Sequence, residues 1–121
     1  MSERVADLIA RLLAEAGVDQ AFLVTGGGAM HLNDAIGRNG RMKWLACHHE
    51  QACAMAAQSY ARVTGRPALV NVTTGPGGTN ALSGVFGAWV DSLPMIVVSG
   101  QVKRETQVSS TGLPLRQLGD Q

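Results

Sequence analysis

The sequence predicts an α/β fold in which helices cover both faces of a parallel sheet. Short apolar runs suited to buried strands, such as residues 21–24 and 68–72, alternate with stretches of helical period. Polar or glycine-bearing patches also recur about every 25 residues, the length of a strand, a turn, a helix and a return loop. Finally, a 45% hydrophobic share with only 4% aromatic residues suits closely packed helices on a sheet.

The N-terminal segment predicts a helix followed by a buried strand. Residues 5–16 place apolar side chains on one helical face, with Ser2 positioned to cap the start and Gly17 to end the helix. The continuous apolar run at 21–24 stops at a triple glycine, as expected of a strand buried on both faces. We therefore expect the first helix to cover the sheet.

Glycines and alanines define the next three elements. A helix over 29–36 is expected to break at Gly37 and Gly40, and a second strand to cover 42–47. The alanine-rich segment 50–63 predicts a third helix, ended by nearby glycine and proline. Its apolar stripe consists of Ala52, Met55, Ala56 and Tyr60.

The third strand, residues 68–72, leads through the turn at 74–78 to a fourth helix and a fourth strand. The helix is marked by apolar residues at helical spacing: Leu82, Val85, Phe86 and Trp89. Pro94 opens the fourth strand, which runs through Val98. Residues 1–102 would thus form the domain core, and the polar segment 103–121 is expected to be a loosely ordered or truncated remainder of the same domain.

Four patches are expected to converge at one edge of this sheet. They are Gly26-Gly27, Glu50, Thr74-Gly75 and Gly100-Gln101, each just after a predicted strand. In open α/β sheets, ligands bind in the crevice outside the carboxyl ends of the strands. The chain is therefore predicted to carry half or more of a ligand cleft.

Composition and charge argue against several classes of partner. The net charge is +1 and the basic residues are dispersed, so no nucleic-acid footprint is visible. The longest apolar stretch is too short to span a bilayer, and charged residues occupy the N-terminus where a secretory signal needs an apolar core. Cys47 and Cys53 lack a CxxC spacing, which favours a reducing, cytoplasmic setting.

The two glycine clusters do not match nucleotide-binding fingerprints. A GxGxxG motif would need glycine where His31 or Asn80 stands, and GxxxxGK[ST] is absent. Two interpretations remain open for each cluster. The glycines let backbone N–H groups approach a flat or anionic ligand, or they form ordinary tight turns.

Glu50 is the titratable residue of greatest interest, because it lies between an apolar strand and an alanine-rich helix. Its carboxylate would sit at a helix start near the ligand edge, where it could shuttle a proton. The simpler interpretation is the preference of helix starts for acidic residues. A third arises because His49, Glu50 and Cys53 imitate the HExxH metal motif, but no further ligand cluster is evident and no metal site is predicted.

Several motifs together resemble the N-terminal domain of the acetolactate synthase, pyruvate oxidase and benzoylformate decarboxylase family of thiamine-diphosphate enzymes. They are HEQ at 49–51, YARVTGRP at 60–67, VTTGPGGTN at 72–80, DSLPM at 91–95 and SGQV at 99–102. The resemblance runs from about Val5 to Val102. It implies a PYR domain, a parallel sheet flanked by helices that holds the aminopyrimidine ring of thiamine diphosphate.

The resemblance also implies site residues. Glu50 matches the family's catalytic glutamate, which hydrogen-bonds a pyrimidine ring nitrogen and so activates the cofactor to its ylid. The cofactor-binding residues by position are Gly26, Gly27, Glu50, Thr74, Gly75, Pro76, Gly77 and Asn80. Thr25 and Gln101 match substrate-side positions, with Thr25 standing where many relatives have proline.

By the same resemblance, the chain is an incomplete piece of a 2-oxo acid enzyme, acetolactate synthase-like and inactive alone. The family binds the diphosphate and Mg²⁺ in a separate domain through a GDG motif that this sequence lacks. The partner would be that diphosphate-binding domain, in the same or another chain, within a homodimer or homotetramer. Two alternatives stay open: a small subunit of a two-chain 2-oxo acid decarboxylase, and a non-catalytic α/β binding or regulatory module.

Overall fold

A computed structural model of the chain describes residues 3–112 and contains one sheet of four parallel strands. The strands are β1 (Gln20–Leu23), β2 (Lys43–Ala46), β3 (Ala68–Val72) and β4 (Met95–Ser99). Their spatial order is β2-β1-β3-β4, and every neighbouring pair is parallel. The predicted α/β class with a parallel sheet is confirmed.

The order of the strands reverses between β1 and β3. From β1 the chain moves outward to β2, then returns past β1 to form β3 and β4 on the other side. Phe22 of β1 pairs with Leu45 on one side and Val70 on the other, which makes β1 and β3 the central strands. A crevice between the carboxyl ends of two such strands is where α/β proteins of this kind bind ligands.

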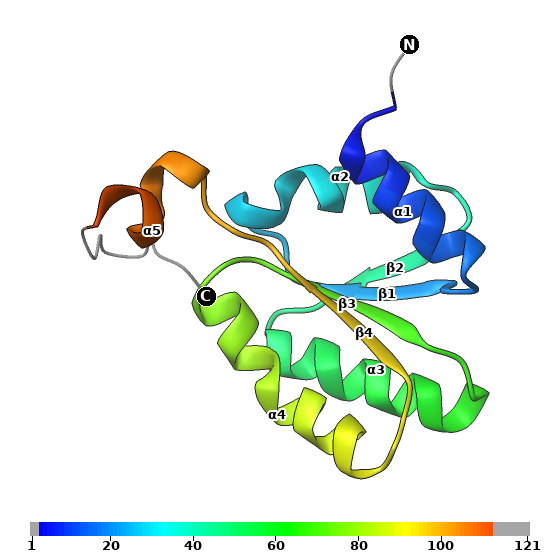
Figure 1. The fold of residues 1–121 in the computed structure, drawn as a ribbon. Helices are drawn as coiled ribbons and strands as arrows, with labels where there is room; N and C mark the ends of the chain where they lie inside the picture. Colours follow the sequence, from blue (N-terminus) through cyan, green and yellow to red (C-terminus); the bar gives the residue numbers. More distant parts are fainter. Residues whose placement is uncertain (1–2, 113–121) are drawn as a thin grey trace.

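Helices cover both faces of the sheet, as Figure 1 shows. On one face lie α1 (Val5–Glu15) and α2 (Met30–Arg38), and on the other lie α3 (Glu50–Thr64) and α4 (Pro76–Val90). The central strand β3 alternates between the two layers. Leu69 packs with α1 and α2, whereas Val70 and Val72 pack with α3 and α4. All five residues of β3 are buried; four are apolar, and the fifth, Asn71, donates a hydrogen bond to Asn33 Oδ1.

Small residues bring α3 and α4 into close contact. A Cβ added at Gly84 of α4 would lie 2.5 Å from the Cβ of Ala54 in α3. Because this interface leaves no room for large side chains, α4 turns its small residues inward, and its large apolar residues face out. Phe86 and Trp89 are 68% and 81% exposed, and α3 likewise buries Cys53, Ala54, Ala57 and Ala61 rather than the Met55 stripe.

The predicted element boundaries need several corrections. The predicted cap of α1, Ser2, lies outside the described residues, and the observed N-cap is Arg4, which makes no side-chain cap. Gly17 follows the end of this helix with a φ of +91°, as expected. Helix α2 does not break at Gly37 but continues to Arg38, because only Gly40 adopts a positive φ, of +71°.

The buried face of α1 is shifted from the predicted one. Ala10 lies at its centre, whereas two apolar residues of the predicted helical face within 5–16, Val5 and Leu12, are 72% and 50% exposed. After Gly100 the chain forms a 3-10 turn, η2 (Arg104–Thr106), and the short α5 (Val108–Thr111). The rest of the predicted C-terminal segment, residues 113–121, lies outside the described residues. Among residues 3–112, no helix has the length and apolar character needed to cross a membrane.

Candidate functional site at the carboxyl edge of the sheet

The loops that follow the strands converge as the sequence predicts. The Gly28 N–H donates to Thr73 Oγ1 at 3.1 Å and joins the loop after β1 to the loop after β3. Thr74 Oγ1 donates to Gln101 Oε1 at 3.0 Å and joins the latter loop to the end of β4. Asn80, in the first turns of α4, reaches the start of α3 by donating to Glu50 Oε2 at 3.0 Å.

Glu50 is the first residue of α3 and is buried, with 9% of its surface exposed. The preceding His49 caps the helix by accepting a hydrogen bond from the Gln51 N–H at 3.1 Å, which fixes where the helix starts. Among residues 3–112, Asn80 is the partner of Glu50 and none of the ion pairs includes Glu50. Its second oxygen, Oε1, lies beside Gly77 without a hydrogen bond from a described residue.

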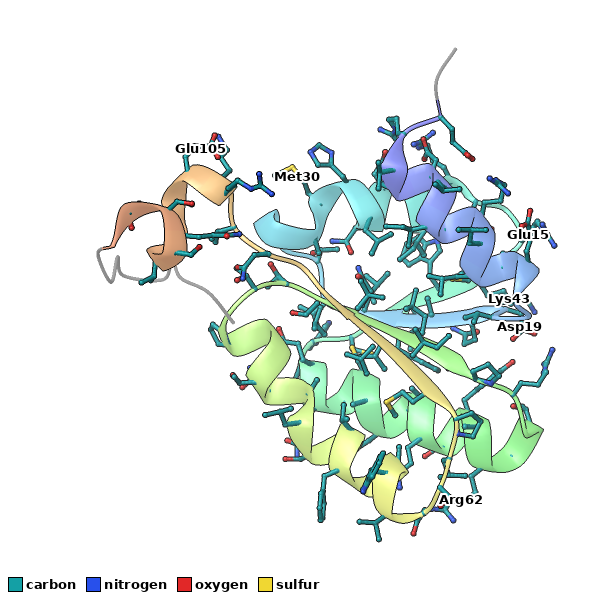
Figure 2. The ribbon with its side chains drawn as sticks, viewed as in Figure 1. Glu15, Asp19, Met30, Lys43, Arg62 and Glu105 are labelled. Atoms are coloured by element: carbon teal, nitrogen blue, oxygen red, sulfur yellow. The ribbon has the colours of Figure 1, made fainter. Side chains whose placement is uncertain are left out.

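A cavity of about 680 Å³ opens at the same edge of the sheet; Glu50 is not among its lining residues, whereas Thr73 and Thr74 of the loop before α4 are. Gly27, Thr74 and Gln101 line it together with residues of α2 and η2. Figure 2 shows Met30, another lining residue, and Glu105 at the same end of the molecule. Because Gln101 Oε1 accepts from Thr74 Oγ1 and from the Val102 N–H at 2.8 Å, its amide Nε2 is the group left for a ligand.

Thr73 also lines the cavity and was not among the site residues predicted from the sequence. Its side chain fills the space that a Cβ would take at two of the predicted site glycines. An added Cβ would lie 2.5 Å from Thr73 Cβ at Gly26 and 2.8 Å from Thr73 Cγ2 at Gly77. The sequence signal that could have identified Thr73 was a threonine directly after a buried strand. The two glycine loops that flank it in space are visible only in the structure.

The remaining predicted residues take distinct places. Gly75 has a φ of +62° and forms the N-cap of α4, with Pro76 at the first helical position, so its backbone conformation requires glycine. Gly27 has no atom within 4 Å of an added Cβ and lines the cavity. Thr25 is exposed, and the structure shows no contact that ties it to the cavity.

The metal-motif alternative gains no support from the geometry. Cys53 is fully buried in the core between α3 and the sheet, and its burial raises the pKa of its thiol to about 12, with the Cys47 thiol adding to the effect. A thiol in that state is a poor metal ligand, since metals bind the thiolate. Within the part of the chain that the structure describes, no three His, Cys, Asp or Glu side chains gather as a metal site would require.

Sequence comparison identifies the family to which this geometry corresponds. The family described as "Thiamine pyrophosphate enzyme, N-terminal TPP binding domain" matches residues 3–119. The match therefore covers every described element and all the residues predicted for the site.

Individual relatives are acetolactate synthases. The chain is 41% identical over 97 residues to the acetolactate synthase large subunit of Haemophilus influenzae and to the isozyme 3 large subunit of Escherichia coli K12. It is 37% identical over 99 residues to the chloroplastic acetolactate synthase of Arabidopsis thaliana. These alignments cover 80% to 82% of this chain but only 15% to 17% of the relatives, so the chain spans about one sixth of their length.

Proposed function

This chain belongs to the thiamine pyrophosphate enzymes, as their N-terminal TPP binding domain, and from this membership we propose that Glu50 activates the bound cofactor. The chain would supply the aminopyrimidine-binding half of a thiamine-diphosphate site. The single observation that carries the proposal is the environment of the Glu50 carboxyl group, which is buried beside a glycine turn and forms no ion pair with any of residues 3–112.

Such a carboxyl group suits a heteroaromatic ring nitrogen. A buried carboxyl group whose one hydrogen-bond donor among residues 3–112 is a neutral amide gains from a ligand nitrogen with which it can share a proton. Asn80 holds Oε2 at 3.0 Å and thereby leaves Oε1 to meet the ligand. Gly77 adjoins that oxygen without a side chain of its own, so a flat ring has room to approach.

When bound, thiamine diphosphate supplies a carbanion at its C2 carbon that adds to a 2-oxo acid and stores the electron pair left by decarboxylation. The part played by this chain is proton transfer and orientation. In the loaded site, Glu50 would hold a proton at Oε1 against the ring nitrogen and so orient the pyrimidine, and the cofactor would supply the base for its own C2 proton. Gln101, proposed for the substrate side, lines the cavity together with Gly27, proposed for the cofactor.

The named relatives favour carboligation after decarboxylation of a 2-oxo acid as the overall reaction. Because the chain spans only about one sixth of their length, the remaining functions require other sequence. We infer that a diphosphate-binding domain, in the same or another chain, holds the diphosphate and Mg²⁺, and that the smallest active assembly is a dimer. The chain by itself is not expected to be active.

The decisive experiment measures hydrogen exchange at C2 of the bound cofactor in the complete protein that carries this chain. Wild type is compared with Glu50→Gln, which keeps the side-chain shape but cannot transfer the proton. Glu15→Gln, an exposed glutamate at the other end of the molecule, is the matched control. Exchange should fall at least about 100-fold in Glu50→Gln alone. Equal exchange rates in all three proteins would remove the proposed role and favour a non-catalytic module.

A further inference from the structure

We propose that Thr73 is a positioning residue, whose side chain fixes the loop after β1 against the start of α4 and thereby holds the two halves of the cofactor site together. The inference rests on the proposed function and deepens it. It concerns a residue that touches neither the proposed ring partner Glu50 nor the substrate-side Gln101 by any hydrogen bond among the described residues.

The hydroxyl group of Thr73 provides the first contact. Its Oγ1 accepts the Gly28 N–H at 3.1 Å across the switch point between β1 and β3. This bond links the glycine loop to the loop after β3 through a side chain. The Gly28 N–H has no other partner among the described residues, so losing the bond would loosen the loop that carries Gly27.

The carbon atoms of Thr73 provide the second contact. They lie where Cβ atoms would stand at Gly26 and Gly77, at only 2.5 Å and 2.8 Å. Both glycines therefore pack against the Thr73 side chain with no room for a Cβ of their own. Because interiors are packed too densely to deform continuously, this packing limits how far the two backbones can move relative to each other.

The backbone of Thr73 extends the same arrangement to β4. Its carbonyl oxygen accepts the Ser99 hydroxyl at 3.1 Å, and the next residue, Thr74, binds Gln101. On the opposite side, Gly77 adjoins Glu50 Oε1, and Asn80, one turn further along α4, donates to Glu50 Oε2. A displaced Thr73 would thus move the Asn80 donor away from Glu50 and Thr74 away from Gln101.

The test uses three variants of the complete protein. Thr73→Val keeps the shape but removes the acceptor for the Gly28 N–H, and Thr73→Ser keeps the acceptor but removes the methyl group beside Gly77. Thr64→Val removes a hydroxyl of the same kind at the far end of α3, where it donates to the Tyr60 carbonyl oxygen at 2.8 Å and accepts from the Arg66 N–H at 3.2 Å. Two quantities are measured: the Kd for thiamine diphosphate with Mg²⁺, and amide hydrogen exchange of the peptide around Gly28.

Thr73→Val should raise the Kd about fivefold and speed exchange at Gly28 by a similar factor, the equivalent of about 1 kcal/mol for one hydrogen bond. Thr73→Ser should raise the Kd while leaving Gly28 protected, and Thr64→Val should change neither quantity. A Thr73 with a merely structural role would lower the melting temperature without altering the Kd measured well below it.

Wild-type Kd values in both Thr73 variants would overturn the proposal. If Thr73→Val fails to fold, Thr73→Ser decides alone, since an unchanged Kd there also overturns it. Failure of the proposed function looks different: the wild-type protein would not bind thiamine diphosphate, or Glu50→Gln would leave C2 exchange intact. In that case the exchange rate at Gly28 still reports whether Thr73 holds the loop.

Discussion

Two acidic side chains at opposite ends of the sheet have contrasting surroundings. Asp19, before β1, accepts a hydrogen bond from the Tyr60 hydroxyl at 2.6 Å and pairs with Arg66 at 2.6 Å. Glu50, beyond β2 at the carboxyl edge, is more deeply buried and has one neutral partner, Asn80. Figure 2 shows Asp19 at the end of the molecule opposite Met30, which lines the cavity.

Asp19 is a carboxylate whose partners stabilise the fold. Glu50 is a carboxylate that the fold buries without such partners, and we propose that it serves the cofactor instead. Hydrogen bonding from Tyr60, together with the charge of Arg66, lowers the pKa of Asp19, so its ionised form is favoured in the folded chain. Glu50 receives no such charge compensation from the described residues. Uncompensated buried acids are costly, and they are typical of sites that move protons.

The largest expected effect comes from exchanging each acid for its amide. Glu50→Gln should lower C2 exchange of the cofactor by at least about 100-fold while the melting temperature stays near the wild-type value, because glutamine keeps the side-chain shape and its amide oxygen still accepts the Asn80 hydrogen bond. Asp19→Asn should leave C2 exchange unchanged. Both quantities are measured on the complete protein. A Glu50→Gln protein that unfolds readily would show that the comparison is wrong.

The second prediction concerns two adjacent glycines, Gly26 and Gly27, whose surroundings differ. Gly26→Ala should cost about 1–3 kcal/mol of unfolding free energy, since its Cβ would overlap Thr73. Gly27→Ala meets no atom within 4 Å and should leave stability within about 0.5 kcal/mol, yet weaken cofactor binding because it narrows the cavity. Urea denaturation and cofactor titration measure the two effects. Equal loss of stability in both variants would contradict the assigned contacts.

A third prediction is that a substitution at Thr73 rescues the stability lost by a substitution at Gly77. Gly77→Ala should destabilise the protein by about 1–2 kcal/mol, because the new Cβ would lie 2.8 Å from Thr73 Cγ2. Thr73→Ser removes that methyl group, so the double variant should regain most of the loss. A double-mutant cycle from urea denaturation gives the coupling energy. Additive effects of the two substitutions would mean that the clash is relieved elsewhere.

The smallest expected effect is at Asp19. Asp19→Asn should cost about 1 kcal/mol near pH 7, a modest amount because the group is partly exposed. Since folding lowers the pKa of Asp19, its contribution is present above the ordinary aspartate value of about 3.9 and disappears as the pH falls through the lowered value. The difference in melting temperature between wild type and Asp19→Asn should therefore shrink below about pH 4. A constant difference would exclude the carboxylate as its source.

Periodicity predicted the elements well where one face is uniformly buried. The strand at Ala68–Val72 and the starts of α3 and β4 follow from continuous apolar runs and from glycine and proline positions. The buried faces of the α3–α4 pair did not follow. Hydrophobicity favours Phe86 and Trp89 as core residues, but the close approach at Gly84 selects alanine and glycine for the interface.

The candidate site was likewise predicted in part. The position of Glu50 at a helix start and the convergence of the loops on one edge follow from the alternation of strands and helices. The sequence could not show why glycine stands at each position of the site, because the answer depends on neighbours that are distant in the sequence. Gly75 has a backbone conformation that only glycine adopts readily. At Gly26 and Gly77, a side chain would overlap Thr73.

The order of residues along the chain determined which segments fold as strands and helices, and it brought the four patches to the same edge, because parallel strands all end there. Only the tertiary structure decided which side chains share that edge as partners. It placed Asn80 on Glu50 and Thr73 between two glycine loops across 30 to 45 residues of sequence. Contacts between residues so distant depend on how helices pack on the sheet, and local sequence patterns carry no record of that packing.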